Sequence, residues 1–263
     1  MLEDPFAYIE TMEDGFVKLV DSMPQANLDS AIVQAARVSY SNSGSDKPGR
    51  SDEGLVRYLM RHHHNTPFEM VEFKFYIKMP IFVARQHFRH RTASINEISA
   101  RYSKVETDFF VPDEYRAQSS VNKQSSEDAI KLDNAKQIES CKFAFSVYNT
   151  LIADGCSREL ARCHLPQSTY TEFFWKINLH NLMHYLQLRM APDAQKEIRD
   201  YATAIFECVK PLAPLTMQAF LDFRVNAITF SGPEVVSFRT GVPLTNQGER
   251  REFEEKKKLL RNT

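Results

Sequence analysis

The 263-residue chain carries 33 lysines and arginines against 34 aspartates and glutamates, which gives a formal net charge of −1. Hydrophobic residues make up 43% and charged residues 25%, as is ordinary for a globular protein with one large core or two small ones. General nucleic-acid binders and membrane-surface binders are usually more basic, so the composition argues against both classes. Any site for an anion must therefore be local.

The N-terminal segment begins with acidic side chains and lacks a basic stretch followed by an apolar core, so we expect no secretory signal. No apolar run approaches the ~20 residues that a membrane-spanning helix needs. The cysteines form no Cys-x-x-Cys pair, which indicates reduced thiols at Cys141, Cys156, Cys163 and Cys208. These features predict a soluble cytoplasmic protein.

The first half of the chain mixes strands and helices. Ser51 can cap a helix whose first turn is acidic, and Pro80 can end a strand and open the next helix. Residues 70–80 alternate apolar and polar side chains, the period of a half-buried strand. We expect strands over residues 16–20 and 70–80, helices over 27–40, 51–63 and 80–91, a loop over 41–50, and loop and strand over 93–104.

The second half of the chain is richer in helix. Gly155 suits the left-handed cap of the longest helix, and Ser157 can cap a short helix that Pro166 stops. Aromatic and β-branched residues predict a strand over residues 168–177. We expect helices over about 126–155, 158–165 and 179–189, a longer one after Pro192 that Pro211 and Pro214 interrupt, and a charge-mixed helix or frayed end over 248–262.

The irregular spacing of these elements lacks the strand–helix alternation of a doubly wound sheet. We therefore predict an α+β fold, a single mixed domain with a central antiparallel-rich sheet flanked by long helices. The sequence contains no Gly-x-Gly-x-x-Gly motif and no phosphate loop ending in Gly-Lys-Ser/Thr. Side chains must then hold any bound nucleotide.

The segment "RHRTASINEISARY", residues 89–102, concentrates arginine. On a helix Arg85 and Arg89 lie one turn apart and repel, unless an anion lies between or beyond them. Arginine suits phosphate and carboxylate because its planar fork matches their oxygens. A solvated basic face with a salt bridge to Glu97 is the simpler alternative. Other side chains nearby favour an anionic, heteroaromatic ligand. Gln86, Asn96 and Ser99 can form hydrogen bonds with the edge of a heteroaromatic ring, and Arg91 and Arg101 add positive charge.

Arg89-His90-Arg91, seven residues and then Ser99 resemble the signature of the flavin-dependent thymidylate synthases. The similarity extends over roughly residues 55 to 205, including "HHHNTPFEMVEFKFYIKMPIFVARQHFRHR" and "RELARCHLPQSTYTEFFWKINLHNLMHYLQLRM". It implies an enzyme that methylates dUMP to dTMP with 5,10-methylenetetrahydrofolate, FAD and NADPH. It also implies a homotetramer with active sites between subunits, a catalytic domain over residues 1–225 and a C-terminal extension over 226–263.

The resemblance also implies functional residues. The substrate set for dUMP is Gln86, Arg89, Glu97, Ser99, Ala100, Arg101, Arg162 and Arg189. The FAD set is Thr66, Glu69, Arg89, His90, Arg91, Thr92, Asn96, Glu97, Asn178, His180 and His184, of which His180 departs from the arginine of many relatives. Arg189 is the catalytic candidate, because a fixed cation beside the N3/O2 edge of uracil favours the deprotonated ring and raises electron density at C5.

Ser99 and Cys163 invite a nucleophile hypothesis. Ser99 has no paired base in the local sequence, so we interpret it as a ligand contact. Cys163 and His164 are neighbours whose side chains diverge on a helix, so we predict that Cys163 is a small buried hydrophobic residue.

Two other classes of function compete with the flavoenzyme. Residues 62–64 are consecutive histidines, but they point in different directions at a helix end without a second ligand cluster, so we expect no metal. A nucleotide or RNA binder could use the arginines with Phe88 and Tyr102, and its affinity would fall steeply with salt.

Overall fold

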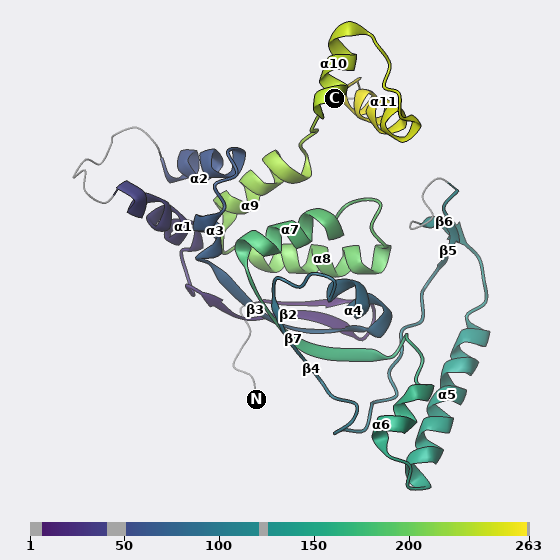
Figure 1. Cartoon of the computed structure of the whole chain (residues 1–263). Coiled ribbons are helices and arrows are strands. Elements are labelled where there is room, and N and C mark those ends of the chain that lie inside the picture. Colours follow the sequence, from purple (N-terminus) through teal and green to yellow (C-terminus); the bar gives the residue numbers. More distant parts are fainter. Residues whose placement is uncertain (1–6, 41–50, 121–125, 262–263) are drawn as a thin grey trace. The chain divides into compact units, whose positions relative to one another are not determined.

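The computed structural model describes residues 7–40, 51–120 and 126–261 (Figure 1). The chain divides into two compact units, Met1–Phe220 and Leu221–Thr263. The first unit contains the sheet and every residue of the predicted sites. The predicted loop over residues 41–50 lies outside the described residues.

A five-stranded sheet in the order β1-β2-β3-β7-β4 forms the centre of the first unit, and every neighbouring pair in it is antiparallel. Its strands are β1 (Ala7–Thr11), β2 (Gly15–Met23), β3 (Glu72–Pro80), β4 (Ser94–Glu97) and β7 (Tyr170–Asn178). β3 alternates buried and more exposed side chains, with Phe75 and Ile77 fully buried. The predicted α+β fold with an antiparallel-rich sheet is confirmed.

Helices cover one face of this sheet (Figure 1). α8 packs against β1 and β2, α4 packs against β3 and β7, and α7 packs between β7, α3 and α8. The bounds are α1 (Leu28–Arg37), α2 (Asp52–Arg61), α3 (Thr66–Glu69), α4 (Ile81–His87), α5 (Ala135–Ala153), α6 (Arg158–Ala161), α7 (Leu179–Arg189), α8 (Lys196–Val209) and α9 (Pro214–Phe220), with 3-10 turns at Val38–Tyr40 and Arg162–His164.

Several local signals act as predicted. The Ser51 side chain accepts the backbone N–H of Gly54 (3.1 Å) at the start of α2. Gly155 has φ 87° after α5, in the left-handed region that glycine occupies without a steric cost. α8 ends just before Pro211 and α9 begins at Pro214, so proline separates these two helices.

Several predicted helices are shorter than expected. α5 begins at Ala135, where the Asp133 carboxylate accepts the Ala135 N–H (2.9 Å), and residues 126–130 instead form β6 (Ser126–Ile130), which pairs with β5 (Tyr115–Gln118). The helix at 80–91 ends at His87, so Arg89 and Arg91 lie beyond it. α1 ends at Arg37, and Val38 is 69% exposed in the 3-10 turn that follows.

The prediction for Cys163 is wrong. The helix predicted over residues 158–165 gives way after Ala161 to a 3-10 turn, and only Ala161 of this stretch reaches the core. Cys163 is therefore exposed, although all four cysteines are free thiols as expected.

The second unit, Leu221–Thr263, opens with a π-helical turn, Leu221–Val225, and contains α10 (Gly232–Thr240) and α11 (Gln247–Arg261). Ser231 and Glu234 form a reciprocal capping box at the start of α10. Lys256 of α11 donates to the buried Glu234 carboxylate (2.8 Å), and the Phe230 and Phe253 rings meet edge to face. Within the described ranges of the whole chain, no helix is both long and apolar enough to cross a membrane.

Candidate active site

The end of α4 and the turn that follows it place two histidines against one tyrosine. Arg89 N–H donates to the Gln86 carbonyl (3.3 Å) and His90 N–H to the His87 carbonyl (3.2 Å), so the chain continues in three-residue turns. This spacing points His87 and His90 to the same side. Both rings lie 4.9 Å, centroid to centroid, from the Tyr185 ring of α7.

Both histidines are neutral at neutral pH. His87 is fully buried and its Nδ1 lies 2.9 Å from the Tyr185 hydroxyl, and burial lowers the pKa of His87 to about 3. Burial, together with the charge of Arg189 and the proximity of His184, lowers the pKa of His90 to about 4. The uncharged His90 ring can therefore accept a hydrogen bond.

Arg189 uses that acceptor. It is the last residue of α7, and its Nε donates to His90 Nε2 (2.9 Å). One terminal nitrogen of the guanidinium also donates to the Gln86 backbone carbonyl (3.4 Å). We name Gln86, His90 and Arg189 the α4–α7 cluster. It brings together residues that the sequence predicted separately for dUMP and for FAD.

A second group lies by the N-terminal end of β7. Arg101 pairs with Glu159 (3.1 Å), and Arg162 Nε donates to the Glu159 carbonyl (3.3 Å). Ser99 Oγ accepts the Arg101 N–H (3.3 Å). Ser99, Ala100 and Arg162 line a cavity of about 450 Å³. We name Ser99, Ala100, Arg101 and Arg162 the β7-edge cluster.

Glu97 lines the same cavity, but it pairs with no arginine in the described structure. Its carboxylate accepts the Thr171 hydroxyl (2.7 Å) across the β4–β7 pair. The alternative of a basic face neutralised by Glu97 is therefore not what the structure shows. No hydrogen bond, ion pair or ring contact joins the α4–α7 cluster to the β7-edge cluster within the described ranges.

Arg89 and Arg91 are exposed, and among the described residues neither has an acidic partner. Thr92 and Asn96 are also exposed beside them. Guanidinium groups without an internal anion fit the phosphates of FAD, because each can donate two parallel hydrogen bonds to phosphate oxygens. The donor set of this segment therefore suits a dinucleotide.

The remaining residues of the predicted FAD set lie on α3, at the end of β7 and on α7, and α3 packs against α7. Thr66 and Glu69 are exposed on α3. Asn178 caps α7 by accepting the Asn181 N–H (2.9 Å), which gives its side chain a structural role. His184 is exposed with its ring 6.1 Å from that of His90, whereas His180 is half-buried one turn earlier.

The sequence did not predict a role for Gln195, which contacts the α4–α7 cluster. The Gln86 side-chain amide donates to Gln195 Oε1, and Gln195 in turn donates to Glu197 Oε2 (2.7 Å). A usable signal was present: Glu197 lies four residues before Tyr201 and eight before Ile205, on the apolar stripe of α8, and a glutamate is rarely buried without a partner.

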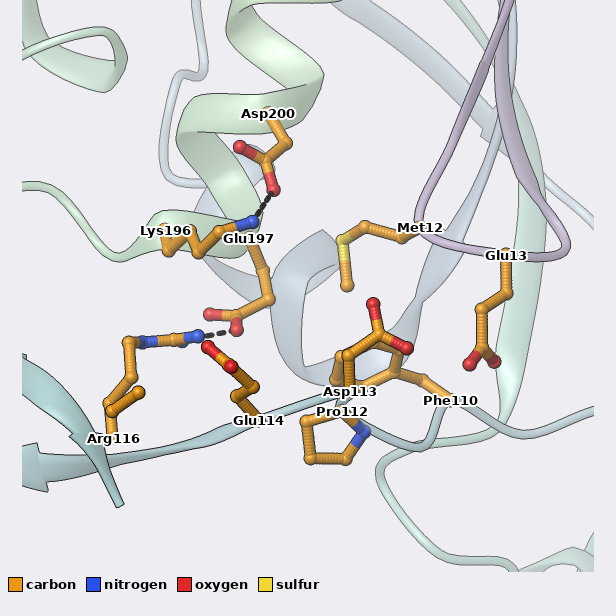
Figure 2. Close-up of a pocket in the computed structure, with 11 residues that line it drawn as sticks. Met12, Glu13, Phe110, Pro112, Asp113, Glu114, Arg116, Lys196, Glu197 and Asp200 are labelled. Atoms are coloured by element: carbon orange, nitrogen blue, oxygen red, sulfur yellow. Dashed lines mark hydrogen bonds and ion pairs between the residues drawn. The ribbon is translucent and has the colours of Figure 1, made fainter. Parts of the chain in front are cut away.

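Another cavity, of about 570 Å³, is lined by more acidic than basic residues and contains none of the predicted site residues (Figure 2). Its wall includes Glu13, Asp113 and Glu114, together with the ion pairs Lys196–Asp200 (2.6 Å) and Arg116–Glu197. Among the described residues, no group of histidine, cysteine, aspartate or glutamate is arranged to hold a metal ion, and residues 62–64 are no exception.

The fold and the two clusters define an α+β protein in which each cluster presents arginine side chains. A family model described as "Thymidylate synthase complementing protein" matches residues 18–215. The chain therefore belongs to this family of enzymes, the flavin-dependent thymidylate synthases, as the arginine segment predicted.

Similar proteins of this family come from distant organisms. The flavin-dependent thymidylate synthase of Dictyostelium discoideum is 47% identical over 265 residues, covering 96% of this chain and 87% of that protein. One from Thermus thermophilus is 49% identical over 242 residues, covering 90% of this chain and 87% of that protein. A solved structure, the UMP/dUMP methylase PolB from Streptomyces cacaoi bound with 5-Br dUMP, is 35% identical with a TM-score of 0.72, covering 82% and 99% of the two chains.

Proposed function

We propose that the chain catalyses the reductive methylation of dUMP to dTMP, with 5,10-methylenetetrahydrofolate as one-carbon donor and NADPH as reductant through FAD. The observation that carries this proposal is the α4–α7 cluster, where Arg189 bonds His90 and Gln86. The candidate contacts for the uracil ring (Arg189), the flavin (His90) and the nucleoside (Gln86) therefore lie together in one chain.

Arg189 acts on the uracil ring. Its Nε–H is occupied by His90, which fixes the plane of the guanidinium and leaves other N–H groups for a ligand. A cation held beside N3 and O2 stabilises the negative charge that develops on the ring, so that C5 becomes the nucleophile towards the one-carbon unit. His90 must stay neutral to hold Arg189, and its lowered pKa ensures this.

The β7-edge cluster and Arg89 bind the phosphate of dUMP. Arg101 and Arg162 flank Glu159, and an incoming phosphate competes with that carboxylate for Arg101. Ser99 Oγ accepts the Arg101 N–H and has no histidine partner among the described residues. A hydroxyl without a base is a poor nucleophile, which supports a contact role for Ser99.

FAD, when bound, supplies the reducing equivalents that NADPH provides. Arg89, Arg91 and Thr92 would hold its phosphates, and the fit rests on guanidinium groups that meet no acid elsewhere in the described structure. The other contacts that we propose come from the exposed face of α3, from residues 96–97, from Asn178 at the N-cap of α7 and from the first two turns of α7.

We further propose a homotetramer in which subunits complete one another's sites. Gln86 and Arg189 of the α4–α7 cluster and all four residues of the β7-edge cluster belong to the predicted dUMP set, yet no contact between described residues of one chain joins the two clusters. A second copy that places its β7-edge cluster near the α4–α7 cluster would complete the set. In this proposal residues 1–225 form the catalytic domain and residues 226–263 an extension.

Release of tritium from C5-labelled dUMP tests the function. Protein loaded with FAD should release tritium with methylenetetrahydrofolate and NADPH, and omission of any one component should stop it. UMP is assayed in parallel, since PolB is described as a UMP/dUMP methylase. A colourless protein that cannot be reconstituted with FAD, or one that releases no tritium from dUMP, contradicts the proposal. Light scattering on the same sample measures the tetramer separately.

A further inference from the structure

A chain of hydrogen bonds runs from the α4–α7 cluster to the acidic cavity of Figure 2. The Gln86 amide nitrogen donates to Gln195 Oε1, and Gln195 Nε2 donates to Glu197 Oε2 (2.7 Å). The Arg116 guanidinium of β5 donates to the other oxygen of Glu197. We name Gln195, Glu197 and Arg116 the relay.

The charges at the far end of the relay fix the direction of every hydrogen bond in it. Arg116 can only donate, and an ionised Glu197 can only accept. Burial favours the neutral form of Glu197, but the bonds from Arg116, from the backbone and from Gln195 outweigh burial and hold the pKa of Glu197 below its ordinary value. Glu197 is therefore a carboxylate at neutral pH.

The orientation of both amides follows. Gln195 must turn its NH2 group to Glu197, so its carbonyl oxygen faces Gln86. Gln86 must then turn its own NH2 group to Gln195. The oxygen and nitrogen atoms of a glutamine amide are normally difficult to distinguish. Here the Glu197 carboxylate, which can only accept, determines which atom is which in both amides. The Gln86 Oε1 atom accepts no hydrogen bond from the described residues, so it is the atom available to a ligand.

We infer that Gln195, Glu197 and Arg116 are positioning residues that make Gln86 present a hydrogen-bond acceptor to the nucleotide. This inference rests on the proposed function, in which Gln86 contacts dUMP. Gln86 then selects a hydrogen-bond donor of the substrate, such as a sugar hydroxyl. A substrate atom that can only accept would face the Gln86 oxygen and be repelled.

The relay is sheltered enough to hold this orientation. The Glu197 side chain is 7% exposed and that of Arg116 is 23% exposed. The Arg116 Nε also donates to Ser126 Oγ (2.9 Å), which fixes the guanidinium between β6 and α8. Buried polar groups that satisfy one another in this way specify one arrangement, because any reversal leaves two donors or two acceptors face to face.

A double-mutant cycle tests the relay. The dissociation constant of dUMP is measured by calorimetry on FAD-loaded protein, for wild type, Glu197→Gln, Gln86→Ala and the double variant. Glu197→Gln keeps the side-chain shape but allows the amides to reverse. We expect it to weaken dUMP binding about tenfold, equal to about 1.4 kcal/mol. In the Gln86→Ala background the same change should weaken binding less than about twofold, because the relay acts only through Gln86.

Glu207→Gln is the matched control, because it removes the same charge from an exposed position of α8. It should leave dUMP binding unchanged. If Glu197→Gln fails to fold, Gln195→Met takes its place in the cycle, since it keeps the Arg116–Glu197 pair and removes both amide bonds.

Equal losses in the two backgrounds, or no loss with wild-type Gln86, would overturn the inference. Failure of the wild-type protein to bind dUMP would instead contradict the proposed function. A raised KM with an unchanged kcat would agree with a role in substrate positioning, whereas a fall in kcat alone would count against it.

Discussion

Acidification should lower the free energy of unfolding because His90 is protonated in the unfolded chain. Replacing His90 by a residue that does not titrate should remove this part of the loss. The pKa of His90 is lowered from 6.5 to about 4 in the folded protein. Between these values the unfolded chain takes up a proton that the folded chain does not, so the free energy of unfolding falls as the pH drops through this window and levels off below it. A shift of this size corresponds to at most about 3 kcal/mol, and solvent screening reduces it to about 1–2 kcal/mol.

His90→Gln isolates the effect. A glutamine oxygen can accept from Arg189 as His90 Nε2 does, but glutamine does not titrate. Unfolding in urea is followed at pH 7 and pH 4.5 by the fluorescence of Trp175, the single tryptophan, which is fully buried with its ring 4.3 Å from that of His87. Wild type should lose about 1–2 kcal/mol more than His90→Gln on acidification.

His87 titrates in both proteins, so its contribution cancels in the comparison. His164→Gln, at an exposed histidine, should retain the wild-type dependence on pH. If His90→Gln loses as much stability as wild type between the two pH values, the neutral His90 that holds Arg189 is refuted.

Three further changes have defined outcomes. Arg189→Ala should abolish tritium release while the absorption spectrum of the bound flavin remains, and retained activity would remove its catalytic role. Gly15→Ala should destabilise the fold by about 2 kcal/mol or more in urea unfolding, because its Cβ would lie 2.1 Å from the Tyr201 hydroxyl oxygen; an unchanged midpoint would contradict this packing. Glu159→Gln should change the free energy of unfolding by less than about 0.5 kcal/mol, because its pair with Arg101 is exposed. Calorimetry at low salt should show that this variant binds dUMP about twofold to threefold more tightly, because a carboxylate no longer competes for Arg101.

The sequence predicted the parts of the fold that one local pattern determines. The alternation at residues 70–80 became β3, and Ser51 and Gly155 mark the ends of helices as expected. β6 was mistaken for helix because all five of its residues, Ser126–Ile130, are exposed and carry no alternating apolar pattern. The end of α4 at His87 was missed because neither glycine nor proline marks it, and buried contacts of the histidines with Tyr185 accompany it instead.

The candidate site also contains residues that the sequence could indicate and one that it could not. The arginines of residues 89–101 could be selected as candidates from the sequence, because their type and spacing lie within one segment. Gln195 could not be selected, because its contact with Gln86 joins positions 109 residues apart in the chain. Nothing local distinguishes a glutamine that orients a ligand contact from a glutamine in solvent. The sequence indicates that Glu197 is buried, but only the fold shows that Gln195 joins it to Gln86.

The three-residue turns after α4 also limit how this enzyme can change during evolution. Consecutive residues of such a turn point about 120° apart, so His90 lies inside while Arg89 and Arg91 lie outside. Insertion or deletion of one residue between Gln86 and His90 would rotate an arginine into the contact with Tyr185 and turn the histidine towards solvent. We therefore expect the length of this turn to tolerate change less well than the identity of its exposed side chains.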